Sequence, residues 1–257
     1  MNEMKRFSFL IVAILSSFIL SAQENPGLPP AAVMIDLTYG MQLPEGNLKK
    51  DFYQNFNLSA KISYLTPRNW LFSVNGDYIF GDEIKTDVLA PLRMSNGLLI
   101  ERTGRMGLTQ LGQRGFYIGG QFGRLFQIGK KTRMHNIELR VGGGYLQHWI
   151  RIRLLGYPED LPQLNGEYLN GYDRRTSGIA LQQYIGYRFM SRSKLINLFI
   201  GLDFTEGFTY NRRYWNFDTR TADKELHTDI LLGFKAGFCI PFFIYSDNTR
   251  SEDLKFY

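Results

Sequence analysis

The chain has 257 residues, of which 44% are hydrophobic and 15% aromatic, and its formal net charge is +6. This length allows one large β domain or two small ones. The only cysteine, Cys239, excludes an intrachain disulfide. Because the sequence also has no Cys/His cluster, we expect no zinc site, no other metal and no cofactor.

Residues 1–22 have the features of a secretory signal peptide. Lys5 and Arg6 precede the apolar run FSFLIVAILSSFIL, and the residues SAQ follow it. A charged start, a short apolar run and a small residue before the cut predict cleavage after Ala22. An uncleaved anchor is the alternative, but a membrane helix needs about 20 apolar residues. Cleavage removes two positive charges and one negative charge, Glu3, so that the net charge falls from +6 to +5. We expect no nucleic-acid partner for an exported protein of this charge.

The rest of the chain alternates between apolar and polar residues. Residues 23–30, QENPGLPP, form a Pro-rich leader that we place in the periplasm. Alternation then covers eight stretches: 33–42, 52–64, 70–80, 116–126, 137–149, 179–189, 196–204 and 232–242. Such a pattern predicts β-strands with two unlike faces. The alternation slips around Arg124 to Phe126, which predicts a β-bulge there. A short helical piece is expected only near Val88–Met94.

The connections between the predicted strands alternate in length. Residues 66–69, 129–135 and 191–194 are short turns, whereas 44–51, 81–114, 151–177 and 209–227 are longer loops. In an up-and-down barrel this places every short turn at one end and every long loop at the other, as in outer-membrane barrels. The sequence therefore predicts an all-β, eight-stranded antiparallel up-and-down transmembrane β-barrel over residues 31–245, followed by a tail, 246–257.

A soluble barrel of the lipocalin type is the competing interpretation, with the apolar face inside. Three features favour a lipid-facing apolar side. An eight-stranded barrel has little interior volume for so many bulky residues. The polar faces are rich in glycine, which suits a narrow interior. The aromatic residues also form two belts, as membrane interfaces select: Tyr39, Phe52, Phe80, Phe116, Trp149 and Tyr210 near the loop end, and Tyr64, Trp70, Phe126, Phe189 and Tyr245 near the turn end.

The polar faces carry four carboxylates and four cations: Asp36, Asp77, Glu138, Asp203, Lys61, Arg140, Arg188 and Lys235. Buried charges are tolerated when they are paired and hydrogen-bonded. We therefore expect an interior charge network that plugs the barrel, with a gated path or proton relay as the alternative. A porin is not expected, because wide channels need about 16 strands.

Catalysis is not expected, although one set of residues could be imagined as an active site. His135 lies in a predicted turn, while His148 and His227 lie near the loop end. With Ser177 and Asp229 nearby by topology, a Ser–His–carboxylate set is conceivable. No nucleophile motif surrounds the serine, so we assign no catalytic residue. A lipid A- or phospholipid-modifying enzyme remains the alternative function.

The long loops are rich in arginine and aromatic residues. Arginine suits phosphate, and tryptophan suits binding surfaces. The candidate binding residues are Arg151, Arg153, Arg174, Arg175, Arg212, Arg213 and Trp215. They predict a surface that docks a protein or lipopolysaccharide partner. The equally weighted alternative is a stiff cap in which the arginines pair with aspartates inside the loops.

The segments SAQ, QLNGEYLNGYDRRTSGIALQQYIGYRF and FTYNRRYWNFDT, together with the aromatic alternating strands, resemble small outer-membrane barrels of Bacteroidota. The resemblance covers essentially the whole mature chain. It implies location in the cell outer membrane after signal-peptide cleavage, and an association with type IX secretion and gliding machinery as an accessory component. It carries over no catalytic residue.

Overall fold

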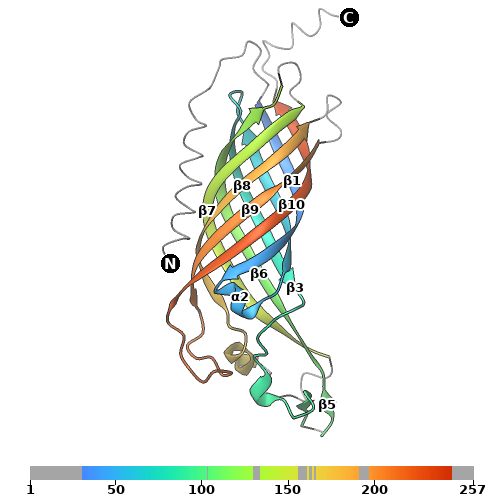
Figure 1. Cartoon of the computed structure of the whole chain (residues 1–257), viewed down its shortest axis with the longest axis vertical. Helices are drawn as coiled ribbons and strands as arrows, with labels where there is room; N and C mark the ends of the chain where they lie inside the picture. The colour runs from blue at the N-terminus through green and yellow to red at the C-terminus, as the bar shows by residue number, and fades with distance from the viewer. Residues whose placement is uncertain are drawn as a thin grey trace, which may run out of the picture.

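The computed structural model describes residues 31–102, 104–129, 134–155, 161, 164, 166–190 and 197–244. Within these residues, eight long strands close into one barrel in the order β1-β10-β9-β8-β7-β6-β3-β2 (Figure 1). The strands are β1 (Ala31–Gly46), β2 (Asn55–Leu65), β3 (Trp70–Gly81), β6 (Thr109–Gln127), β7 (His135–Leu154), β8 (Thr176–Met190), β9 (Asn197–Asn211) and β10 (Leu226–Ile244). All neighbours are antiparallel, and strands adjacent in the chain are adjacent in the barrel. The predicted up-and-down barrel is confirmed.

The predicted signal peptide, the leader, the tail and Tyr245 lie outside the described residues and stay predictions. Shorter elements occupy the long connections at one end of the barrel, the lower end in Figure 1. They are α2 (Leu48–Asp51), η2 (Ala90–Leu92), the hairpin of β4 (Leu99–Ile100) and β5 (Met106–Gly107), and η5 (Gly166–Gly171). In the described part of the chain, no helix combines the length and the hydrophobicity needed to cross a membrane.

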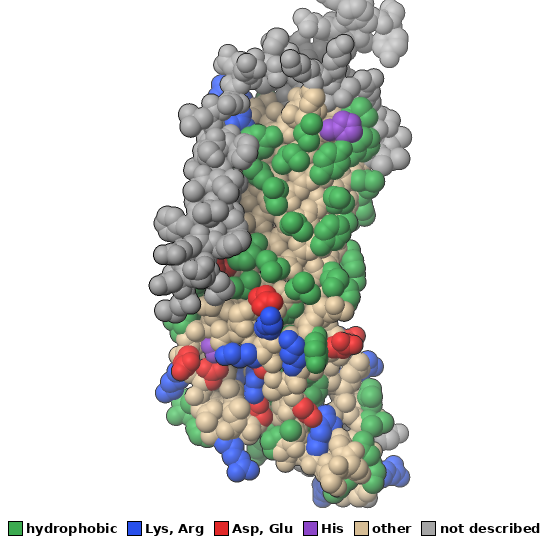
Figure 2. Space-filling model, viewed as in Figure 1, with side chains coloured by type: hydrophobic (Ala, Val, Ile, Leu, Met, Phe, Trp, Pro, Cys, Tyr) green, Lys and Arg blue, Asp and Glu red, His purple; other side chains and the backbone are tan. Residues whose placement is uncertain are grey.

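The polar face of each strand points into the barrel and the apolar face points out. In β2, for example, Asn57, Ser59 and Lys61 are buried, whereas Leu58 and Ile62 are 57% and 59% exposed. A space-filling view shows hydrophobic side chains in a broad band over the strands, while charged side chains gather toward the loop end (Figure 2). This arrangement is the reverse of a soluble barrel, and a lipid-facing charge at mid-depth would cost about 2–4 kcal/mol. The barrel is therefore a transmembrane one.

Inward-facing glycines make room for large side chains in the narrow interior. A Cβ added to Gly186 would lie 2.2 Å from the Tyr184 hydroxyl, and one added to Gly201 would lie 2.6 Å from it. A Cβ on Gly119 would similarly lie 2.2 Å from the Tyr117 hydroxyl. An eight-stranded barrel encloses little more than its own side chains. The two buried tyrosine rings therefore require glycine beneath them.

Two local predictions are wrong. Phe52 does not belong to β2 or to the outer belt, because it pairs with Ile84 as an isolated bridge and is only 3% exposed. The predicted bulge near Arg124 is also wrong, since residues pair one to one along β6 and β7 through this region. The alternation slips there because Leu125 points inward and joins an apolar cluster at the turn end, where the interior is not polar.

Candidate functional site

The interior holds two layers of charged side chains. The layer nearer the turns, called the turn-side cluster, consists of Asp36, Lys61, Glu138, Arg140 and Arg188. Arg188 is fully buried and donates two hydrogen bonds to Asp36, at 3.0 and 2.7 Å, and one to Glu138 at 2.7 Å. The Lys61 ammonium lies 2.8 Å from Asp36, and the Arg140 guanidinium lies 2.9 Å from Glu138. Each carboxylate therefore has more than one cation.

Two aromatic rings complete the turn-side cluster. The guanidinium carbon of Arg140 lies 4.0 Å from the centroid of the Tyr184 ring. That of Arg188 lies 4.6 Å from the centroid of the Phe199 ring. A cation over a ring face is attracted by the ring quadrupole, and more strongly where water is excluded. With three cations and two carboxylates, this cluster carries a formal charge of +1.

The second layer, called the middle cluster, consists of Asp77, Gln182, Asp203 and Lys235, with Asn75 beside it. The Lys235 ammonium lies 2.8 Å from Asp77 and 3.1 Å from Asp203. The amide nitrogen of Gln182 donates to the same two carboxylates, at 3.2 Å each, and its oxygen accepts from Asn75 at 3.1 Å. This layer carries a formal charge of −1, which balances the turn-side cluster.

Apolar side chains close the barrel at its loop end. The closure, called the mouth core, combines inward-facing residues of the strands with residues of the loops. It includes Leu48, Phe52, Ile79, Val88, Leu89, Leu146, Ile150, Leu161 and Leu231, each at most 3% exposed. Sequence reasoning missed its loop residues because loops have no period that reveals burial. It missed Ile79, Leu146, Ile150 and Leu231 because they are apolar residues on the inward faces, which are otherwise mostly polar. The polar layers are thus sealed from the loop side by a hydrophobic plug.

The imagined catalytic set does not form. His148 contacts Asp229 at 2.8 Å and Thr176 at 2.7 Å. Ser177 lies on the opposite face of β8 from Thr176, and its hydroxyl accepts a hydrogen bond from Arg212. The ring of Phe52 covers His148, with centroids 5.9 Å apart, and the imidazole is buried. The histidine is therefore part of the packing beneath the mouth core. His135 and His227 bond Tyr187 and Asp223, respectively.

Several of the predicted binding arginines tie the loops together. Arg174 bonds Asp51 at 2.7 Å in the β1–β2 connection and also bonds Asp218 in the β9–β10 loop. Arg213 bonds Asp173 at 2.8 Å, and this hydrogen bond raises the pKa of the guanidinium. The loops between β7 and β8 and between β9 and β10 are thus fastened to each other. We call these fastened loops the cap.

Aromatic packing and backbone hydrogen bonds add to the cap. The Tyr172 and Phe217 rings meet edge to face at 5.4 Å, and the Phe217 amide donates to the Gly171 carbonyl at 2.9 Å. Burial and the nearby Asp218 carboxylate raise the pKa of Tyr172. The β3–β6 connection joins the assembly through Thr86, which donates to Asp51 at 2.8 Å. All four long connections therefore contribute to one structure.

Arg175 and Arg212 contribute to these ties, since the Arg175 guanidinium lies 3.6 Å from Asp173 and the Arg212 amide donates to the Arg175 carbonyl at 2.7 Å. Arg151, Arg153 and Trp215 lie apart from them. Arg175 lies over the Trp149 ring at 5.4 Å, at the edge of the belt. Arg151 and Arg153 are exposed on β7. Trp215 is 42% exposed, and it neighbours Tyr214, which is 85% exposed. Sequence reasoning missed Tyr214 and the exposed Tyr168 of η5 as surface aromatics.

Comparisons with known proteins find similarity only at the level of structure. No family model matches the sequence, and no curated protein matches it. Neisserial surface protein A is 12% identical, with a TM-score of 0.42 over 82% of this chain and 97% of that one. Ail of Yersinia pestis, solved with the heparin analogue sucrose octasulfate, is 9% identical, with a TM-score of 0.42 over 82% and 99%. The outer membrane protein OprG of Pseudomonas aeruginosa is 10% identical, with a TM-score of 0.38 over 85% and 99%.

Proposed function

We propose that the protein is a non-enzymatic component of the cell outer membrane whose cap docks a protein partner in the envelope. The observation that carries this proposal is the exposure of Tyr168, Tyr214 and Trp215 on loops that are fastened by buried or half-buried ion pairs. Tyrosine and tryptophan dominate binding energy at protein interfaces. A surface that is already ordered loses little conformational entropy when it binds.

The ion pairs divide the candidate binding residues into two groups. Arg174 and Arg213 have their charges used within the cap, so we assign them to holding it together. Trp215 and its neighbour Tyr214 are free to meet a partner. The interior clusters are assigned a structural role, because their formal charges cancel and the mouth core covers them. The resemblance to Bacteroidota barrels adds the proposal that the partner belongs to the type IX secretion machinery.

Capture from the native membrane tests the docking proposal. The protein is extracted in a gentle detergent as wild type, as Tyr214→Ala/Trp215→Ala, and as Tyr64→Ala. Tyr64 is a matched control because it is a similarly exposed aromatic residue in the opposite belt. We expect a stoichiometric partner with the wild type and the control, and its loss with the double variant. A wild-type barrel recovered alone would contradict the proposal.

A second measurement addresses the alternative function. Lipid A and phospholipids from a deletion strain are compared with those of the parent by mass spectrometry. Because His148 is buried and does not reach Ser177, we expect identical profiles. A lipid species missing from the deletion strain, and restored by the wild-type gene but not by His148→Gln, would favour the lipid-modifying enzyme instead.

A further inference from the structure

A small hollow lined by arginines lies on the outer side of the β6–β7 hairpin. Its volume is about 120 Å³, and the residues around it are Asp82, Gln110, Leu111, Gly112, Arg114, Arg151 and Arg153. Arg151 and Arg153 are two residues apart on β7, so their side chains share one face. Gly112 is the register partner of Arg151 across the ladder. The absence of a side chain at Gly112 helps to leave this space open.

The hollow has an excess of positive charge. Arg114 is held in place by the Gly81 carbonyl at 3.1 Å and by Asp82 at 3.0 Å. Arg151 and Arg153 are exposed, and no acidic partner is found for either among the residues that the structure describes. The lining residues therefore sum to a formal charge of +2. A guanidinium group can donate two parallel hydrogen bonds to a phosphate, so a phosphate is the complementary ligand for this hollow.

The hollow lies at the level where lipid headgroups meet the barrel. Arg114 pairs in register with Phe80 on one side and with Trp149 on the other, and both of these belong to the loop-end aromatic belt. Such belts mark the boundary between hydrocarbon and headgroups. Arg151 and Arg153 lie two and four residues beyond Trp149 along β7, on the loop side of the belt. Arg151 and Arg153 would therefore be within reach of the lipid phosphate groups in the outer leaflet.

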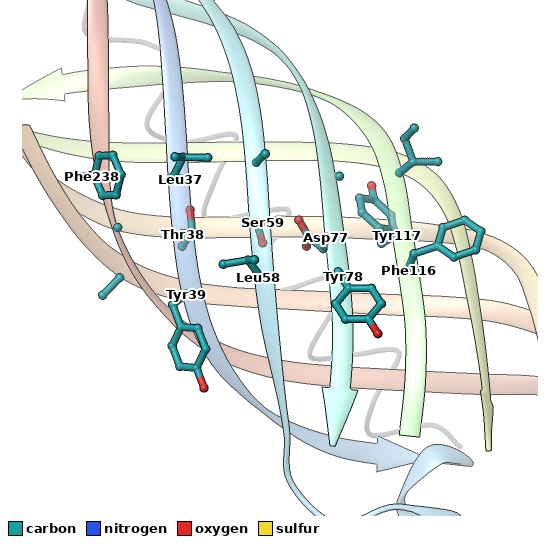
Figure 3. Close-up of a pocket in the computed structure, with 15 residues that line it drawn as sticks. Leu37, Thr38, Tyr39, Leu58, Ser59, Asp77, Tyr78, Phe116, Tyr117 and Phe238 are labelled. Carbon is teal, nitrogen blue, oxygen red and sulfur yellow. The ribbon is translucent and has the colours of Figure 1, made fainter. Parts of the chain in front are cut away.

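An apolar hollow lies near the arginine hollow along β6. Phe116 lies two residues from Arg114 on the same face of β6. It lines a depression of about 670 Å³ on the outer surface. Figure 3 shows this depression crossing β10, β1, β2, β3 and β6. Its outward-facing lining includes Tyr39, Leu58, Ala60, Gly76, Tyr78, Ile118, Ala236 and Phe238. The small residues Ala60, Gly76 and Ala236 lie among larger neighbours and leave the depression open.

The dimensions of the apolar hollow suit one acyl chain. Five adjacent strands are separated by about 4.8 Å each, so the depression extends roughly 19 Å across the sheet. An acyl chain that spans half of a bilayer's hydrocarbon core is about 15 Å long, so one chain fits within this length. A Cβ on Gly76 would meet only the Tyr117 carbonyl, at 4.0 Å, so the depression is not filled by the protein itself.

We propose that Arg114, Arg151 and Arg153 bind the phosphate of a membrane lipid whose acyl chain lies in the adjoining apolar hollow. The charge excess selects the headgroup, and the proximity of the two hollows along β6 favours a lipid over a free phosphate. This lipid site is on the side of the barrel and does not depend on docking at the cap. A partner-free barrel would leave it intact.

Native mass spectrometry of the full-length protein tests the lipid site. Lipid A and enzymatically dephosphorylated lipid A are added separately to the delipidated, folded barrel in detergent. We expect one tightly retained lipid A per barrel and at least about tenfold weaker retention of the dephosphorylated form, given the strength of hydrogen bonds to charged groups. Equal retention of the two forms would overturn the proposal.

Two variants and a control separate the headgroup from the acyl chain. Arg151→Gln/Arg153→Gln should weaken lipid A retention at least about tenfold. Arg102→Gln/Arg105→Gln removes the same charge from exposed positions in and beside the β4–β5 hairpin and should retain lipid A. An equal loss in this control would mean unspecific charge attraction and would refute the site. Gly76→Phe fills the apolar hollow and should also weaken retention.

Competition distinguishes a lipid from a soluble anion. Inorganic phosphate and glucosamine 1-phosphate are titrated against bound lipid A. We expect neither to displace it at a hundredfold molar excess, because neither can occupy the apolar hollow. Displacement by either would show that the arginines bind a soluble phosphate. Lipid A retention that Gly76→Phe leaves unchanged would show that no acyl chain occupies the apolar hollow. Either result would overturn the lipid assignment. Unboiled gel mobility confirms that each variant is folded before it is compared.

Discussion

Replacing Arg188 by methionine tests whether the interior network holds the barrel together. Arg188 is fully buried and makes three hydrogen bonds to two carboxylates. Breaking a buried ion pair by removing one partner costs about 3–5 kcal/mol. After the substitution Asp36 keeps Lys61 at 2.8 Å and Glu138 keeps Arg140 at 2.9 Å, so neither carboxylate is left bare. We therefore expect Arg188→Met to lower the free energy of unfolding by about 3 kcal/mol, the lower end of this range, which is roughly a 150-fold shift in the folding equilibrium.

The assay is reversible urea unfolding in lipid vesicles. Tryptophan fluorescence reports on Trp70 and Trp149, which are near the two ends of the barrel, and on Trp215 in the cap. Unboiled gel mobility reports on the folded barrel. Arg105→Met is the matched control, because this arginine is exposed and its loss should change stability by no more than about 0.5 kcal/mol. If Arg188→Met unfolds at the same urea concentration as the wild type and the control, the structural role of the network is wrong.

A double variant shows whether the loss comes from the ion pair itself. Asp36→Asn removes one of the two carboxylates that Arg188 contacts. Residues within one salt-bridge network have interaction energies of about 0.5–3 kcal/mol. Asp36→Asn/Arg188→Met should therefore be more stable than the sum of the two single losses implies. Simple additivity would mean that Arg188 acts by filling space and not by pairing.

Three further predictions concern other parts of the molecule. Lys235→Met leaves Asp77 and Asp203 without their shared cation and should lower the unfolding free energy by about 3–5 kcal/mol, with part of it recovered in Asp203→Asn/Lys235→Met. Gly186→Leu collides with the Tyr184 ring and should prevent folding as judged by gel mobility, whereas Gly76→Leu, on the outer face, should be tolerated. Arg174→Ala unfastens three connections of the cap, so limited proteolysis should cut the loops faster than in the wild type while the urea midpoint of the barrel stays unchanged.

Which residues of each strand point inward and which point outward could be predicted from the sequence, because this depends only on a period of two. Lys61 and Asp77 each lie between outward apolar neighbours, and both are buried. Which charges meet could not be predicted in the same way. Arg188 on β8 bonds Asp36 on β1, although two other strands separate them around the barrel. That pairing depends on the stagger of the whole barrel and on side chains reaching across its interior, and neither is visible in a local pattern.

The loops were predictable in composition but not in arrangement. The abundance of arginine and aromatic residues in residues 151–177 and 209–227 indicates either a binding surface or a stiff cap. In the structure Arg174 and Arg213 form ion pairs within the cap, whereas Trp215 is exposed, and its role in binding stays a prediction. Leu48 and Val88 are buried in the mouth core although they lie outside the barrel strands. Their burial follows from tertiary packing between connections far apart in the chain, which no periodicity records.

The charged interior also fixes the register of the strands. If the interior were apolar, both faces of every strand would be alike, and a shift by one residue would meet little resistance. In this barrel a shift of β7 by one residue would turn Glu138 and Arg140 toward lipid, at about 2–4 kcal/mol for the cation at mid-depth. It would also separate Glu138 from Arg188 and Lys61 across the interior. Because this penalty adds to the loss of pairing, the charged interior opposes a one-residue shift that an apolar interior would tolerate.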